Sequence, residues 1–86
     1  EYSLQSNFPN PFNPSTVINF AVKEAGLVSL KVYDILGSEV ATLVNETREA
    51  GNFAVEFNAA NLPSGVYIYT LQVNDFTSSK KMLLMK

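Results

Sequence analysis

The fold is decided by Tyr67-Ile68-Tyr69-Thr70-Leu71-Gln72-Val73-Asn74-Asp75-Phe76, a stretch in which two patterns follow one another. Large apolar side chains occupy every second position as far as Val73, and successive side chains of a strand point to opposite faces of a sheet. Asn74-Asp75 then interrupts the pattern, and both residue types tolerate the positive φ that tight hairpin turns need. The stretch therefore predicts a half-buried strand, a hairpin turn and the start of the next strand.

The same period of two recurs on both sides of this stretch, separated by segments rich in turn residues. Strands are expected at Tyr2–Gln5 as an edge strand, and at Val17–Val22, Val28–Val32, Glu39–Val44, Phe53–Phe57, Tyr67–Val73 and Phe76–Met85. We expect Asn45–Asn52 to be a polar loop. Glu39–Glu49 also allows a helical face, although the glycines that bracket it favour a hairpin arm. Short strands at this spacing predict an all-β fold, a small antiparallel β-sandwich.

Composition limits what this domain can do. The chain has 86 residues, of which 47% are apolar and 16% charged, enough for one small core. It contains no Cys, His or Trp, which excludes disulfides, thiol or imidazole catalysis and the usual zinc, haem and iron–sulfur ligand sets. The net charge of −2 is opposite to that of a nucleic-acid-binding surface. No apolar run is long enough for a transmembrane segment.

Few residues form a pattern that could carry chemistry. Ser78 and Lys81 match S-x-x-K, but residues three apart in a strand point to opposite faces, so we expect no catalytic site. Asp34 and Asp75 fall at turns, where carboxylates usually cap backbone N–H groups. A calcium site at these turn carboxylates is left open, and no other metal, cofactor or cofactor-binding residue is expected. Asn45-Glu46-Thr47 is a glycosylation sequon of the kind that arises by chance.

The tyrosines raise the question of a carbohydrate-binding platform. Tyr67 and Tyr69 share one face of their strand with Leu71 and Val73, so we expect them in the core. One of them is expected to make a hydroxyl hydrogen bond like that of a tyrosine corner.

The two ends of the chain differ from the rest. Three prolines fall within Phe8–Pro14, so residues 1–15 are expected to form a stiff, extended strap, pinned by Phe8 and Phe12, that leads into a sandwich over residues 16–86. The tail, Lys80–Lys86, has apolar side chains on both faces, which predicts a strand buried between neighbours. The strap could instead be a recognition strip, and the tail could be bound through strand addition.

Four motifs, in order, resemble the type A C-terminal sorting domain of the type IX secretion system. They are Pro9-Asn10-Pro11-Phe12-Asn13 within Leu4–Thr16, the turn centred on Gly37 within Val32–Ala41, Leu62–Tyr67, and the closing Lys80–Lys86. The resemblance covers essentially the whole chain. Ser38 departs from the family pattern, which more often has a basic residue at this position of the turn.

The resemblance implies a seven-stranded immunoglobulin-like sandwich at the C-terminus of a larger secreted protein, and a first residue other than Met agrees with a piece of a longer chain. The domain would be an address and not an enzyme. Its partners would be the N-terminally fused cargo, the outer-membrane translocon and a cell-surface sortase that removes it. It would pass through the periplasm to the cell surface or the medium. The residues implied in partner recognition are Pro9, Asn10, Pro11, Asn13, Gly37, Gly65, Tyr67, Lys81 and Lys86.

Two other functions stay open at this point. One is a structural immunoglobulin-like spacer or scaffold, similar to the domain of flagellar hook-capping proteins. The other is an accessory carbohydrate-binding module of a secreted enzyme, which should expose aromatic side chains in a row.

Overall fold

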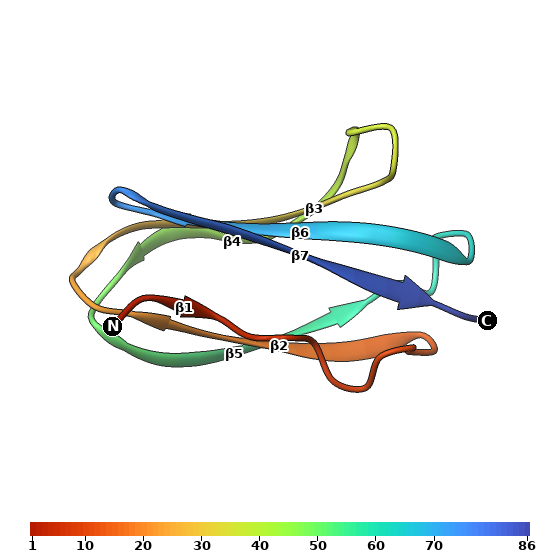
Figure 1. Ribbon diagram of the computed structural model, residues 1–86, viewed down its shortest axis with the longest axis horizontal. Helices are drawn as coiled ribbons and strands as arrows, with labels where there is room; N and C mark the ends of the chain where they lie inside the picture. Colours follow the sequence, from red (N-terminus) through yellow and green to blue (C-terminus); the bar gives the residue numbers. More distant parts are fainter.

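The computed structural model describes residues 1–86 and shows two antiparallel sheets packed face to face (Figure 1). The first sheet contains β1 (Ser3–Leu4), β2 (Ser15–Val22) and β5 (Gly51–Asn58), in the order β1-β2-β5. The second contains β3 (Gly26–Tyr33), β4 (Glu39–Arg48), β6 (Gly65–Val73) and β7 (Phe76–Leu84), in the order β4-β3-β6-β7. The predicted all-β sandwich of about seven strands is confirmed. No helix long and apolar enough to cross a membrane occurs in the structure.

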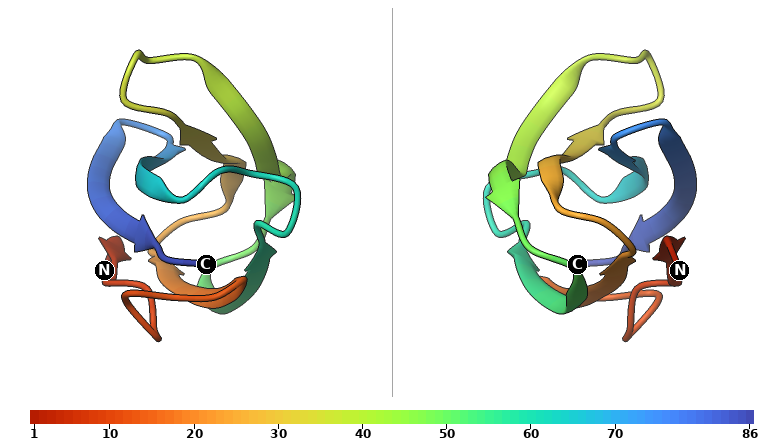
Figure 2. Two further views of the ribbon diagram at one scale, coloured as in Figure 1. Left: turned by 90° about the vertical axis from the view of Figure 1, so that its right-hand side faces the viewer. Right: turned by 90° about the vertical axis from the view of Figure 1, so that its left-hand side faces the viewer.

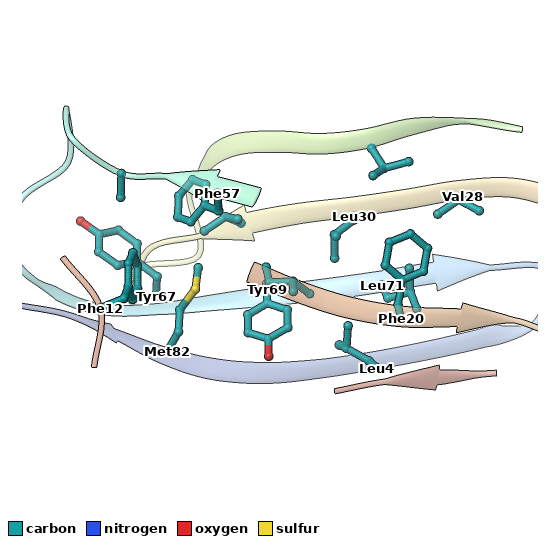
Figure 3. Packing of buried hydrophobic residues seen from close by; sticks show 14 of the residues in the cluster. Leu4, Phe12, Phe20, Val28, Leu30, Phe57, Tyr67, Tyr69, Leu71 and Met82 are labelled. Carbon is teal, nitrogen blue, oxygen red and sulfur yellow. The ribbon is translucent and has the colours of Figure 1, made fainter. Parts of the chain in front are cut away.

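The core lies between the sheets and is filled by every second residue of the strands. Figure 3 shows side chains from both sheets meeting there, from Leu4 of β1 to Met82 of β7. The alternating rows of β2, β3 and β6 are buried throughout: Ile18, Phe20, Val22, Val28, Leu30, Val32, Tyr67, Tyr69, Leu71 and Val73. In β5, only Phe57 of the predicted row is fully buried, because β5 is an edge strand whose other inner residues reach solvent.

The predicted loop at Asn45–Asn52 is wrong. β4 continues to Arg48 and β5 begins at Gly51, so only two residues separate them. The polar residues at the end of β4 pair with β3 as far as Gly26, and the backbone ladder does not need apolar side chains on an exposed face. This pairing also rules out the helical alternative for Glu39–Glu49.

β7 is an edge strand, which corrects the prediction that it lies between two neighbours. It pairs with β6 on one side, from Val73–Phe76 to Gly65–Leu84, and no strand is hydrogen-bonded to its other side, although β1 of the other sheet lies nearby. The tail was expected in the sheet interior because both of its faces carry apolar residues. The C-terminal part of its outer edge is paired with another segment, described below.

The hydroxyl of Tyr69 joins the core to the N-terminal segment. Tyr69 is fully buried, and its hydroxyl donates to the backbone oxygen of Gln5 at 2.7 Å and accepts the Asn7 N–H at 2.9 Å. The Asn7 side-chain amide then donates to Thr16 Oγ1 and to the backbone oxygen of Pro9. Burial raises the pKa of Tyr69, so the neutral hydroxyl is favoured. One side chain of the second sheet therefore positions the segment that enters the first.

We predict that Tyr69→Phe lowers the free energy of unfolding by about 1–3 kcal/mol, because the Asn7 N–H is left buried without a partner. Tyr33→Phe is the matched control, since the Tyr33 hydroxyl makes no hydrogen bond within the protein, and it should change stability by less than about 0.5 kcal/mol. Urea unfolding of both variants measures the difference. Equal losses in the two would contradict this role for Tyr69.

Candidate functional site

Four segments that are far apart in the sequence meet at one end of the sandwich. They are the proline-rich part of the strap (Phe8–Pro14), the β3–β4 turn (Asp34–Ser38), the β5–β6 loop (Ala59–Ser64) and the last residues (Met85 and Lys86). Figure 2 shows the loops and the C-terminus at this end, facing the viewer on the left. We call it the motif end.

The strap closes the C-terminal part of the β7 edge. The Phe12 N–H donates to the Leu83 backbone oxygen, and the Met85 N–H donates to the Phe12 backbone oxygen, both at 3.0 Å. The Leu83 N–H donates to Asn10 Oδ1 at 3.0 Å. The Phe12 side chain enters the core, where its ring centroid lies 6.2 Å from that of Phe57. The strap therefore takes the place at this end of β7 that the sequence predicted for a neighbouring strand, whereas the outer apolar face of the tail stays partly open, with Leu83 half-buried and Met85 55% exposed.

The strap also pairs with the other sheet, and for that reason it is not extended throughout as predicted. Phe8 exchanges two backbone hydrogen bonds with Val17 of β2, both at 3.0 Å, whereas Phe12 bonds to the end of β7. The chain must cross from one sheet to the other within four residues, so it bends between Pro9 and Pro11. Pairing with Val17 turns the Phe8 side chain outward, where it is 78% exposed. The expectation that Phe8 pins the strap through its side chain is therefore wrong.

The last residues are bound to the β5–β6 loop. The Lys86 N–H donates to Ser64 Oγ at 3.0 Å, and Lys86 Nζ donates to the Ala60 backbone oxygen at 2.6 Å. The same loop reaches the strap, because the Ala59 N–H donates to the Pro14 backbone oxygen at 2.8 Å. Strap, loop and tail are thus joined by direct hydrogen bonds.

The β3–β4 turn is a rigid support for two exposed aliphatic side chains. Asp34 Oδ1 accepts the N–H groups of Leu36 and Ser38, and Gly37 takes φ +87°, a left-handed conformation that glycine adopts without strain. Ile35 and Leu36 at the tip are 72% and 87% exposed. Residue-by-residue propensity marks this segment only as a turn. The signal that was missed is the apolar pair Ile35-Leu36 itself. At an exposed turn, polar residues would fold equally well, so two aliphatic residues there indicate a contact surface.

Asp34 Oδ1 is occupied by backbone N–H groups, as expected for a turn carboxylate. No group of three or more acidic side chains comes together anywhere in the chain. The turn carboxylates Asp34 and Asp75 are not brought into such a group.

Two shallow cavities of about 250 Å³ each lie beside these segments. The first separates the β3–β4 turn from the β5–β6 loop and is lined by Ile35, Val40, Leu62, Pro63, Val66 and Tyr67, among others. The Tyr67 hydroxyl donates to the Pro63 backbone oxygen at 2.6 Å, the tyrosine-corner-like bond that the sequence predicts. The second cavity is lined by Asn10, Val66, Lys81, Met82 and Leu83.

The residues that the sequence singled out for recognition fall into two groups. Those with exposed side chains on the strap and the tail are Pro9, Asn10, Pro11, Asn13, Lys81 and Lys86. Gly37, Gly65 and Tyr67 instead shape the turn and the loop, and Tyr67 is 5% exposed. With Tyr69 fully buried as well, these two strand tyrosines form no exposed aromatic row of the kind that binds carbohydrate.

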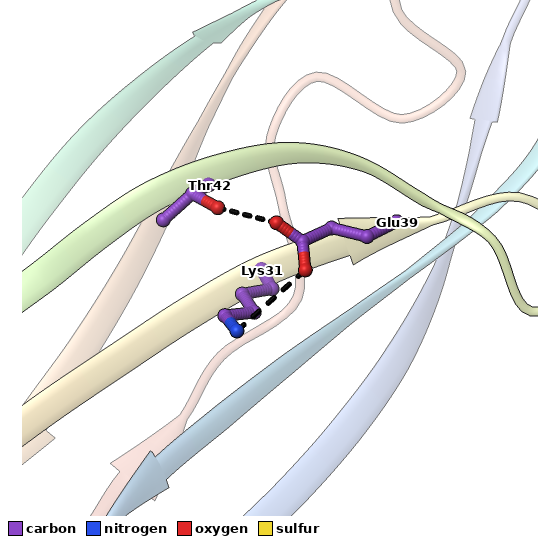
Figure 4. A network of polar contacts seen from close by, with 3 residues as sticks. All are labelled: Lys31, Glu39 and Thr42. Carbon is purple, nitrogen blue, oxygen red and sulfur yellow. Dashed lines mark hydrogen bonds and ion pairs between the residues drawn. The ribbon is translucent and has the colours of Figure 1, made fainter.

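A polar cluster stabilises the base of the β3–β4 hairpin (Figure 4). Thr42 Oγ1 donates to Glu39 Oε2 at 2.6 Å, and Lys31 Nζ lies 3.6 Å from Glu39 Oε1. The Thr42 hydroxyl, aided by Lys31 and opposed by desolvation, lowers the pKa of Glu39. The carboxylate therefore stays charged as it connects the start of β4 to β3.

Comparison with known families gives a match. A family model described as a secretion system C-terminal sorting domain matches residues 6–85. The matched range includes the motif end except for Lys86, and every strand except β1. No curated protein matches the chain.

Phe12 and Phe8 provide a matched pair for testing how the strap is held. Phe12→Ala should lower the free energy of unfolding by about 3–5 kcal/mol, because it empties a buried site at the strap–β7 contact. Phe8→Ala should change it by less than about 0.5 kcal/mol, since that ring is exposed. Chemical denaturation measures both, and similar losses would show that the side chain of Phe12 does not hold the strap.

The Glu39 cluster predicts a pH dependence of known sign. Because the folded-state pKa lies below the unfolded value of about 4.3, the cluster stabilises the fold above that value, and the stabilisation is lost as pH falls through the folded pKa. Glu39→Gln should therefore be less stable than the wild type at neutral pH, with the difference vanishing in strong acid. A difference that persists at about pH 2 in denaturant titrations would contradict this account.

Proposed function

The chain belongs to the secretion system C-terminal sorting domain family, and we propose that the motif end is the surface that the outer-membrane translocon reads. The family is one of type IX secretion sorting signals, which direct an N-terminally fused cargo to the cell surface or the extracellular space. It is not an enzyme family. The proposal adds to this which part of the domain is recognised and by which residues.

One observation carries the proposal: the four sequence motifs, distant along the chain, lie at one end of the sandwich. The strap, the β5–β6 loop and the tail are hydrogen-bonded to one another there, and the β3–β4 turn faces the loop across a shallow cavity. Asn10 and Leu83 are 73 residues apart and share a hydrogen bond of 3.0 Å. Lys86 reaches back to Ser64 and Ala60 in the same region. Motifs that served only to fold the domain would have no reason to share one end of it. A single receptor surface can contact all four.

We assign two kinds of role to the recognition residues. Pro9, Asn10, Pro11, Asn13, Lys81 and Lys86 offer exposed side chains to the translocon. Gly37, Gly65 and Tyr67 act through the shapes of the turn and the loop. Ile35 and Leu36, which the sequence did not single out, add an apolar contact that is nearly fully accessible before binding.

The later steps also belong to the proposal. The domain passes through the periplasm folded, and a surface sortase removes it at a site before or near Glu1. That region is exposed and precedes the first strand, whereas strand backbone is held in ladders that a protease cannot enter. We keep residues 1–15 as the strap and 16–86 as the sandwich, with Leu4 and Phe12 of the strap packed into the common core.

A fusion experiment tests the role of the motif end. The domain is attached to a periplasm-targeted reporter in a host that has the secretion system. Truncating the tail is a poor test, because it removes Met82 and Leu84 from the core. We use the double variant Ile35→Ser with Leu36→Ser, which changes only exposed side chains, and expect about tenfold less reporter at the surface and in the medium.

Leu27→Ser is the matched control. Leu27 is 60% exposed and lies at the opposite end of the sandwich, at the start of β3, so its replacement should leave export unchanged. Thermal unfolding of the isolated domains checks that all variants are folded. Equal export of the double variant and the wild type would refute the assignment of the motif end, and retention of the wild-type fusion in the periplasm would favour a structural spacer.

A further inference from the structure

The outer edge of β7 is closed at its C-terminal end and open over Thr77–Lys81. In an antiparallel ladder, backbone groups point alternately toward the paired strand and away from it. The N–H and C=O of Leu83 point away from β6, since they bond to Asn10 and Phe12. The same alternation turns the backbone groups of Thr77, Ser79 and Lys81 outward. No hydrogen bond within the protein reaches these outward groups.

The open stretch is also positively charged. Lys80 and Lys81 lie at its C-terminal end, and neither forms a salt bridge. Lys80 stands opposite Tyr69, so it points to the inner face of the sheet at its edge, a placement that discourages pairing between identical edges. The side chains of Thr77, Ser79 and Lys81 are exposed, so none of them covers the backbone. The edge therefore repels a second copy of itself and attracts an acidic chain.

An extended segment already pairs along this edge within the protein. Phe12 forms a parallel bridge with Leu84, and the open stretch begins directly beyond it. β1 runs close beside this part of β7, and Tyr2 stacks on Phe76 at 5.4 Å between ring centroids. The backbone of β1 nevertheless pairs with β2 in the other sheet and makes no hydrogen bond to β7. The edge thus accepts backbone pairing from outside β6, and the strap occupies only part of its length.

We propose that the open β7 edge, Thr77–Lys81, binds an extended acidic segment of a secretion partner by strand addition. This inference rests on the proposed function and adds the chemistry of the partner. Backbone hydrogen bonds to Thr77, Ser79 and Lys81 provide the pairing, and carboxylates beside Lys80 and Lys81 provide the charge match. The added strand continues the line that the strap begins, so strap and partner together would cover the whole edge.

The test uses the 86-residue chain and a synthetic seven-residue peptide of alternating valine and glutamate. The expected dissociation constant is roughly 0.1–1 mM, and peptide binding should slow hydrogen exchange of the Thr77, Ser79 and Lys81 amides. The matched peptide of alternating valine and lysine should bind at least about tenfold more weakly. Equal binding of the two peptides, or unchanged exchange at saturation, would overturn the proposal.

Two substitutions at one position separate the backbone from the side chain. Ser79→Pro removes an outward N–H while leaving the ladder to β6 intact, and should weaken binding of the acidic peptide at least about tenfold. Ser79→Ala removes only the hydroxyl bond to Thr70, at 2.7 Å, and should bind as the wild type does. Equal losses in both variants would overturn strand addition.

Sedimentation of the chain alone provides a third outcome. A monomer is expected, and a dimer whose exchange protection covers Thr77–Lys81 would show that the occupant is a second copy and not an acidic partner. If the peptide experiment fails, the proposed function is not affected, because the two are tested separately. The fusion experiment changes Ile35 and Leu36 in the β3–β4 turn and leaves β7 unchanged.

Discussion

The architecture of the motif end depends on the hydrogen bonds that the buried Tyr69 hydroxyl makes to Gln5 and Asn7. They fix Asn7 inside the protein, and its side-chain amide in turn holds the backbone of Pro9. From that fixed point the strap can leave the first sheet and reach the edge of the second. Because hydrogen bonds to a buried hydroxyl are costly to break, the position of the strap is a property of the core and not of the surface.

Local pattern was enough to predict the strands and most of the core. Alternation at Ile18–Val22, Val28–Val32 and Tyr67–Val73 reports directly which face is buried, since the side-chain period of a strand is two. The same pattern contains no information on which strands are neighbours. β7 was placed inside a sheet for this reason, although the residue that covers its outer side, Phe12, is far away in the sequence.

The sequence identified the segments that form the candidate site. It did not predict that these segments lie together on one surface. The motifs identified the strap, the turn, the loop and the tail, but their convergence follows from long-range pairing that no local window contains. The strap shows the limit most clearly. Phe8 and Phe12 are the same residue type and each adjoins a proline, yet one is 78% and the other 2% exposed, because Phe8 pairs with β2 and Phe12 with β7.

The bond between Asn10 and Leu83 has a consequence for the timing of synthesis. A surface that needs both Asn10 and Leu83 cannot form on a nascent chain that lacks its last strand, even if the N-terminal part has already folded. It forms only after the last strand has been made and has docked against the strap. A receptor that binds this surface would therefore not bind unfinished or truncated chains. Binding would then depend on complete translation and folding of the domain.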